Sequence, residues 1–388
     1  MKIAVNTRLL LKDRLEGIGI FSRETLSRIT KAHPEHQFYF LFDRDYDESF
    51  VFSDNVTPLV AHPQARHPYL WYLFFEYGIP LKLKQIKPDI FVSTDGWIPT
   101  RLKIPTVNVI HDLNFKHHPE FVPPVVRRYY DRFFPKFARN ATRLATVSQF
   151  SCDDIHQCYQ VPTDRIDVVY NGANSAYKPY TEEQQKLIKQ QYTDGCDYFL
   201  FVGLIHKRKN LDNIFKAFDM FKERTHSPMK LAVVGDKKWW AGEIEDTYLA
   251  MRHRGDVVML GRQQIDVLSA LTAAATALVY ASLFEGFGQP IVDAFNAHTP
   301  VITSDISSMP EIAGDAALLV NPYHAEEIAE AMFQLYDSPE LRKQLIEKGI
   351  ARENLFTWER SAELLWQTIE RVLPYEKSGA FAPLSFLQ

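Results

Sequence analysis

The chain of 388 residues has few cysteines, no excess of basic charge and no long hydrophobic run. Its cysteines, Cys152, Cys158 and Cys196, lack the close spacing of zinc and redox motifs, so we expect reduced thiols. The formal net charge of −4 disfavours a nucleic-acid binder, which needs a basic face. No stretch approaches the ~18 consecutive apolar residues that a membrane-spanning helix requires. Because the N-terminal apolar run is also too short for a signal peptide, we expect a cytoplasmic protein.

Short apolar runs alternate with helical patterns along the chain. They are rich in β-branched and aromatic residues, as strands buried on both faces are. In the first half they cover residues 3–6, 38–42, 90–93, 106–110, 144–147 and 166–170. In the second half they cover residues 198–202, 230–234, 257–260, 277–280, 301–303 and 317–320. This alternation predicts an α/β protein with doubly wound parallel sheets.

The alternation pauses in the middle of the chain. Asn171-Gly172 is a turn signal and Lys178-Pro179 interrupts any continuing element, before the pattern restarts at residue 198. We therefore expect two Rossmann-like domains that face each other across a cleft, over residues 1–176 and 177–360. Residues 361–388 are expected to form a C-terminal helix and tail, with packing back on the N-terminal domain as one option.

The segment 285–293, with the sequence EGFGQPIVD, follows a predicted strand and begins a helix. Ligands of parallel sheets bind beyond the carboxyl ends of the strands, so this turn faces the expected site. Gly286 and Gly288 allow a ligand to approach the backbone, while Glu285 and Asp293 can bind hydroxyl groups. An ordinary strand-to-helix turn would explain the same residues equally well.

Two further loops carry residues suited to phosphate. Gly203 ends a predicted strand and Lys207–Lys209 follow it, where cations suit a diphosphate, although most charge runs are simply solvated. Gly17 and Gly19 lie between the first predicted strand and the first predicted helix. They form only part of a dinucleotide-binding fingerprint, which disfavours a nicotinamide-dependent oxidoreductase.

Together these motifs resemble glycosyltransferase family 4, a large retaining family with the GT-B fold. The resemblance covers nearly the whole chain and is carried by KIAVNTR, GIGIFSRETL, VGLIHKRKNL, EGFGQPIVDA and TSDISSMPEIAGDAALLVNP. The basic loop is similar to that of a mannosyltransferase subgroup, which favours GDP-mannose as the donor. No cofactor is implied beyond the nucleotide-diphosphate sugar itself, and no metal.

The resemblance also implies roles for single residues. Arg208 and Lys209 would hold the donor diphosphate, Glu285 would bind the transferring sugar and Asp293 the ribose. The implied catalytic residues are His111, Lys209 and Glu285. The implied donor-binding residues are Gly17, Gly19, Gly203, Arg208, Lys209, Glu285, Gly286, Phe287, Gly288, Gln289 and Asp293. The chain departs from the family in having Asp293 in place of the usual Glu, and Leu204 where many members have Arg.

Three further features of the sequence could be explained by the fold alone as well as by a function. His111 ends a predicted strand, where a role in the core explains it as well as contact with sugar does. The DxD patterns at Asp43, Asp45 and Asp47 are better explained by a solvated acidic loop than by a metal site. The basic helix at residues 125–139 and the aromatic stretch at residues 69–75 are expected to place their aromatic side chains in the core, with peripheral membrane contact as the alternative.

The sequence thus predicts a retaining, metal-independent hexosyltransferase of polysaccharide or glycan biosynthesis. Its acceptor would be a glycan or a lipid-linked glycan at the inner face of the membrane, bound by residues that the sequence does not identify. Two other functions stay open. One is a non-catalytic subunit that binds a sugar nucleotide, and the other is a GT-B-type sugar-nucleotide epimerase.

Overall fold

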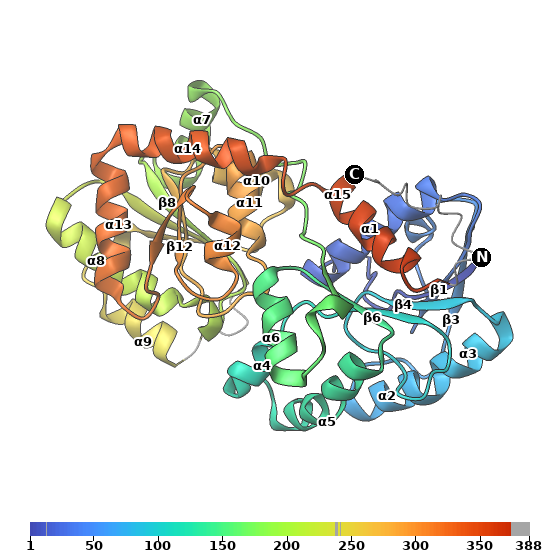
Figure 1. The fold of residues 1–388 in the computed structure, drawn as a ribbon. Helices are drawn as coiled ribbons and strands as arrows, with labels where there is room; N and C mark the ends of the chain where they lie inside the picture. The colour runs from blue at the N-terminus through green and yellow to red at the C-terminus, as the bar shows by residue number, and fades with distance from the viewer. Residues whose placement is uncertain (13, 237–239, 241, 374–388) are drawn as a thin grey trace, which may run out of the picture. The chain divides into compact units, whose positions relative to one another are not determined.

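The computed structural model describes residues 1–373 except 13, 237–239 and 241. The chain divides into two compact units, and each is built around a parallel sheet of its own (Figure 1). The first unit is Met1–Tyr170 together with the chain from Trp358 onward, and the second is Asn171–Thr357. Both borders lie a few residues before those expected from the sequence, and residues 374–388 of the expected tail lie outside the described residues.

The sheet of the first unit has seven parallel strands in the order β3-β2-β1-β4-β5-β6-β7. The strands are β1 (Lys2–Asn6), β2 (Gln37–Phe42), β3 (Val56–Val60), β4 (Ile90–Ser93), β5 (Thr106–Val109), β6 (Arg143–Thr146) and β7 (Ile166–Val168). The sequence prediction missed β3, which contains Pro58 and forms the edge of the sheet. Proline cannot donate a ladder hydrogen bond, so strands that contain it lie at edges and lack the usual pattern.

Helices cover both faces of this sheet. They are α1 (Gly17–Ala32), α2 (Pro68–Leu73), α3 (Ile79–Ile86), α4 (Asn114–His117), α5 (Pro124–Asn140), α6 (Gln149–Tyr159) and α15 (Trp358–Glu370). A π-helical turn at Phe74–Gly78 joins α2 to α3. The C-terminal helix α15 packs against α1 within this unit. Because α1 begins at Gly17, Gly17 and Gly19 form its first turn and not the loop that the sequence predicted.

The sheet of the second unit has six parallel strands in the order β10-β9-β8-β11-β12-β13. They are β8 (Tyr198–Val202), β9 (Lys230–Val234), β10 (Val257–Gly261), β11 (Ala277–Tyr280), β12 (Val301–Ser304) and β13 (Ala317–Val320). The helices are α7 (Glu182–Thr193), α8 (Leu211–Thr225), α9 (Glu243–Ala250), α10 (Ile265–Ala274), α11 (Gln289–Asn296), α12 (Met309–Ala313), α13 (Ala325–Asp337) and α14 (Pro339–Glu353). The two α/β units with parallel sheets confirm the predicted fold class. In the part of the chain that the structure describes, every helix is too short or too polar to cross a membrane.

Candidate functional site

The basic loop at Lys207–Lys209 and the turn that begins the segment 285–293 meet at the carboxyl edge of the second sheet. This follows from the strand order, because β8 and β11 are neighbours although a long stretch of chain separates them. Lys209 Nζ lies 2.6 Å from Glu285 Oε1, and Arg208 Nη1 lies 2.6 Å from Glu285 Oε2. One carboxylate is therefore held between two cations.

The electrostatics of Glu285 are set by burial and by these two cations. The residue is only 8% exposed, which by itself would favour the neutral acid. The charges of Arg208 and Lys209 outweigh that effect and lower the pKa of Glu285 to about 2. Lys209 Nζ also donates to the Tyr280 hydroxyl at 2.7 Å, and burial raises the pKa of Tyr280 well above its usual value. At neutral pH the centre therefore holds two positive charges, one carboxylate and a neutral phenol.

The turn after Glu285 is fixed by hydroxyl groups from the segment before α12. Ser308 Oγ lies 2.9 Å from the carbonyl oxygens of both Glu285 and Phe287 and shares its one hydrogen between them. Ser307 Oγ accepts from the Glu285 amide at 3.1 Å. Gly288 precedes α11 with φ +103°, a conformation that favours glycine. These hydrogen bonds hold the turn that leads into α11.

Gly203 lies under the side chain of Lys209. A Cβ atom at Gly203 would lie 3.5 Å from the Lys209 Cδ and Cε atoms, and its φ of +155° also disfavours other residues. The aliphatic part of Lys209 therefore rests on this glycine while its ammonium group reaches Glu285. Gly203, which follows β8, therefore lies beside a side chain of the basic loop.

Asp293 lies one helical turn into α11, away from the cations that bind Glu285. The Asn174 amide donates to its Oδ1 at 3.0 Å, and the Gln289 side chain donates to the same atom at 3.1 Å. Burial raises the pKa of Asp293 to about 7 despite these bonds. Gln289 also donates to the Gly172 carbonyl at 2.9 Å, so its side chain ties the segment after β7 to α11.

His111 and Gly19 belong to the first unit. His111 follows β5, and its Nε2 lies 2.9 Å from the Thr94 carbonyl oxygen, while its ring packs edge-on against Phe21. Burial lowers the pKa of His111, so the ring is neutral at neutral pH, with its proton on Nε2 facing the carbonyl. A Cβ atom at Gly19 would lie 2.8 Å from the Leu9 carbonyl oxygen, so α1 approaches the preceding loop closely there.

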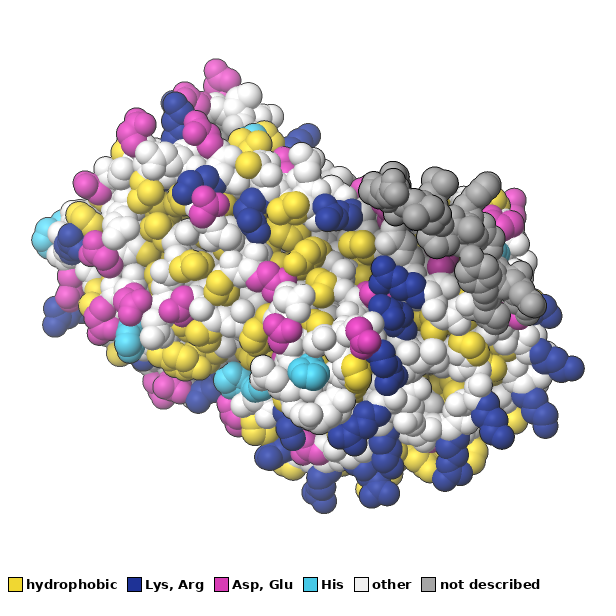
Figure 2. Space-filling model, viewed as in Figure 1, with side chains coloured by type: hydrophobic (Ala, Val, Ile, Leu, Met, Phe, Trp, Pro, Cys, Tyr) yellow, Lys and Arg dark blue, Asp and Glu magenta, His cyan; other side chains and the backbone are white. Residues whose placement is uncertain are grey.

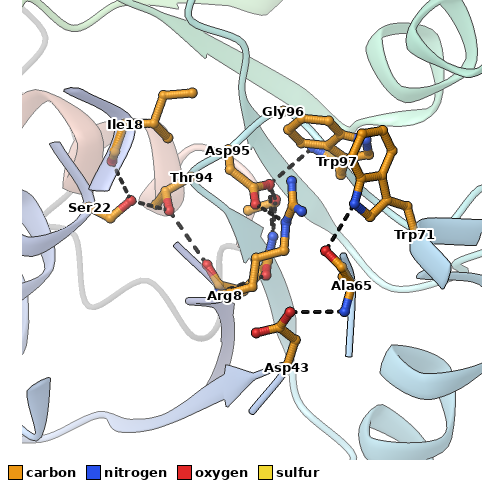
Figure 3. A network of polar contacts seen from close by, with 12 residues as sticks. Arg8, Ile18, Ser22, Asp43, Ala65, Trp71, Thr94, Asp95, Gly96 and Trp97 are labelled. Atoms are coloured by element: carbon orange, nitrogen blue, oxygen red, sulfur yellow. Dashed lines mark hydrogen bonds and ion pairs between the residues drawn. The ribbon is translucent and has the colours of Figure 1, made fainter. Parts of the chain in front are cut away.

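A buried polar network, which the sequence did not indicate, occupies the carboxyl ends of β1 and β4 (Figure 3). Arg8 Nε lies 2.6 Å from Asp95 Oδ2, and the guanidinium lies 4.2 Å from the centre of the Trp97 ring. Asn6 donates to the other Asp95 oxygen at 2.8 Å. Burying an ion pair is costly unless it gains compensating contacts. Here the second Asp95 oxygen also accepts from the Trp97 amide, and the guanidinium lies over the Trp97 ring.

The predicted solvated acidic loop is wrong for Asp43. This residue is buried, pairs with Arg44 and accepts a hydrogen bond from the Ala65 amide at 2.9 Å (Figure 3). Its carboxylate thus fixes the loop after β3 to the end of β2. Asp45 is exposed, as expected, and Asp47 pairs with Lys12 at 2.7 Å.

Two groups among the described residues have donor atoms close enough to share a metal ion. They are His33, Glu35 and His36, and His117, Asp154 and Cys158. In the second group, His117 Nε2 lies 2.7 Å from Asp154 Oδ1. Both groups belong to the first unit, and neither includes a residue that the sequence singled out for donor binding.

Comparisons with known proteins identify the family of the chain. The family described as Glycosyltransferase Family 4 matches residues 17–177, and Glycosyl transferases group 1 matches residues 183–352. O-antigen chain mannosyltransferase B of Escherichia coli is 26% identical over 370 residues, which cover 92% of this chain and 97% of that protein. O-antigen chain mannosyltransferase RfbU of Salmonella typhimurium is 27% identical over 285 residues, which cover 72% of this chain and 75% of that protein.

Among solved structures, the sucrose-phosphate synthase of Thermosynechococcus elongatus matches with a TM-score of 0.77 and 16% identity. The match covers 95% of this chain and 98% of that one, and it supports the GT-B fold of two Rossmann-like domains. The two family matches together take in most of the chain, including every predicted site residue. The chain therefore belongs to glycosyltransferase family 4.

Proposed function

We propose that the protein is a retaining mannosyltransferase that uses GDP-mannose and needs no metal ion. Its acceptor would be a growing, lipid-linked glycan on the cytoplasmic face of the membrane. The observation that carries the proposal is the convergence of Arg208 and Lys209 on Glu285 at the carboxyl ends of β8 and β11. The similarity to two O-antigen mannosyltransferases supports the choice of sugar.

The proposed reaction breaks the bond between the sugar C1 and a phosphate oxygen and forms a bond from C1 to an acceptor oxygen. Negative charge grows on the departing diphosphate, and fixed cations stabilise that charge. Arg208 and Lys209 would supply the stabilising positive charge. A bound metal ion performs this task in other enzymes. The leaving phosphate oxygen would take the proton of the acceptor hydroxyl, on the same face of the sugar. Glu285 would accept hydrogen bonds from the sugar hydroxyls.

The donor and the metal requirement are testable together. Thermal-shift measurements with GDP, UDP, dTDP and ADP should show stabilisation by GDP above all, since ligand at 100 times its Kd adds about 2.7 kcal/mol. Transfer from GDP-mannose to a lipid-linked glycan acceptor should then persist in excess EDTA. Complete loss that manganese or magnesium restores would refute metal independence. Donor conversion without any acceptor would point to an epimerase, and binding without turnover to a non-catalytic subunit.

The raised pKa of Asp293 predicts pH-dependent donor binding. An ionised carboxylate accepts hydrogen bonds from both ribose hydroxyls, whereas the protonated acid accepts fewer. Because its pKa is about 7, the donor KM should fall as the pH rises through neutrality. Asp293→Asn should raise the KM with little change in kcat and should flatten this pH dependence, whereas Asp293→Glu should preserve it.

Stability provides a second readout for the same residue. A carboxyl group whose pKa is higher in the folded state than in the unfolded chain disfavours folding once it ionises. The cost is absent at pH values below about 4, where both states are protonated, and is complete above the folded pKa of about 7. Asp293→Asn should therefore raise the free energy of unfolding, relative to the unmodified protein, more at pH 8 than at pH 5. An unchanged difference between the two pH values would contradict the assigned pKa.

A further inference from the structure

One face of the first unit exposes an unusual number of large apolar side chains. Residues 68–86 run through α2, the π-helical turn and α3, and their inner side packs into the core. Their outer side carries an apolar stripe, which we define as Tyr69, Tyr72, Leu73, Tyr77 and Leu81. Tyr69, Tyr77 and Leu81 are 73%, 57% and 63% exposed. A contiguous exposed apolar surface of this kind marks an interaction site more often than a scatter of single residues does.

The local backbone explains why these side chains share one face. Tyr69, Leu73, Tyr77 and Leu81 recur at intervals of four residues. In a regular α-helix that spacing drifts by about 40° per step, because one turn takes 3.6 residues. The turn at Phe74–Gly78 is π-helical and therefore wider, so it takes up part of the drift. The stripe consequently continues from α2 onto α3 without passing to the buried side.

The stripe borders a strongly basic helix. Tyr72 packs against Phe133 of α5, with 5.7 Å between the ring centres. The same Phe133 ring has Arg132 and Lys136 over it, at 5.8 and 5.6 Å. The exposed cations of α5 are Arg127, Arg128, Arg132, Lys136 and Arg139, against the single acid Asp131. Figure 2 shows Lys and Arg side chains gathered along the edge where α2, α3 and α5 lie in Figure 1.

Charge and exposure together identify the kind of partner. The whole chain has a net charge of −4, so this basic region is a local exception. An anionic bilayer attracts such cations to its phosphates, while tyrosine and leucine side chains enter the boundary between head groups and acyl chains. A second copy of the chain would also cover apolar groups, but it would bring the two basic helices α5 close together, and like charges repel.

We propose that the apolar stripe and the basic face of α5 form a surface that docks on an anionic lipid bilayer. The sequence left peripheral membrane contact as an alternative for the basic helix and the aromatic stretch at residues 69–75. The structure assigns them separate parts, because the aromatic rings of α5 pack inward and the stripe on residues 68–86 supplies the inserting groups. The inference rests on the proposed function, because a lipid-linked acceptor lies in a membrane. Lipid binding itself can be measured without any transfer assay.

Co-sedimentation of the full chain with vesicles tests this surface. Vesicles of phosphatidylcholine mixed with an equal amount of phosphatidylglycerol should bind the protein, and phosphatidylcholine alone should bind it far less. The double variant Tyr77→Ser/Leu81→Ser should reduce binding to anionic vesicles by about tenfold or more. The double variant Arg128→Glu/Arg132→Glu should reduce it as strongly and remove most of its sensitivity to salt. Leu187→Ser is the matched control, because Leu187 on α7 is 63% exposed, as Leu81 is.

The outcomes separate this inference from the proposed function. Stabilisation by GDP and transfer to a lipid-free glycan should be unchanged in both double variants, which also shows that they fold. Equal binding by the stripe variant and the unmodified protein would overturn the proposal, as would equal binding to neutral vesicles. A dimer in analytical ultracentrifugation that the stripe variant loses, without lipid binding, would assign the surface to a second copy of the chain.

Discussion

Glu285→Gln should nearly abolish sugar transfer while leaving the affinity for bare GDP unchanged or higher. The Glu285 carboxylate pairs with both Arg208 and Lys209, each at 2.6 Å. An incoming diphosphate must compete with that carboxylate for the same two cations. Glutamine removes the competing charge but also replaces one of the two carboxylate oxygens that we assign to the sugar hydroxyls with an NH2 donor. The variant should therefore lose the contribution of the sugar and keep that of the nucleotide.

Calorimetry with GDP and with intact GDP-mannose, alongside kcat, separates these contributions. Glu243→Gln provides a matched control, because Glu243 pairs with Lys207 of the same basic loop at 2.9 Å but lies exposed. This control should leave both affinities and kcat close to those of the unmodified protein. If Glu285→Gln weakened GDP and GDP-mannose equally, the proposed contact between Glu285 and the sugar would be wrong.

The strands of both sheets could be predicted because buried parallel strands are continuous apolar runs. Residues 90–93 and 198–202, for example, form β4 and β8 with the predicted bounds. The edge strand β3 could not, because Pro58 interrupts its pattern. The resemblance singled out Glu285 and Lys209 as expected site residues, but their contact depends on β8 lying beside β11, an adjacency that sequence order does not reveal.

Supporting residues were missed for a related reason. Ser308 stands in an ordinary helix-start sequence, and only the folded chain brings its hydroxyl to the carbonyls of Glu285 and Phe287. Arg8 and Asp95 lie far apart in the sequence and meet because β1 pairs with β4. Asp43 was assigned to solvent because charged neighbours surround it in the sequence, whereas the amide of Ala65 and the guanidinium of Arg44 make its burial tolerable. The structural role of such buried polar residues becomes evident only when the folded chain shows which groups they bond to.

Lys209→Met should lower kcat by ~10²–10³, by analogy with the loss of a single donor that stabilises transition-state charge. Methionine keeps an unbranched apolar chain over Gly203, where the Lys209 Cδ and Cε atoms now lie, and removes only the charge. The loss should appear in kcat more than in the donor KM, because the leaving diphosphate gains negative charge as the bond breaks. Arg208 remains to hold the ground-state diphosphate and to pair with Glu285, so Lys209→Met should still bind GDP.

Two variants make this result specific. Lys207→Met removes a charge from the same loop, where Lys207 pairs with the exposed Glu243, and it should leave kcat nearly unchanged. Tyr280→Phe removes the hydroxyl that accepts from Lys209 Nζ without altering the charge, and it should lower kcat far less than Lys209→Met does. A Lys209→Met enzyme with unchanged kcat/KM would show that its ammonium group serves only to pair with Glu285. If the Lys209 ammonium group stabilises the leaving phosphate, the loss of kcat should be much larger for Lys209→Met than for Tyr280→Phe or Lys207→Met.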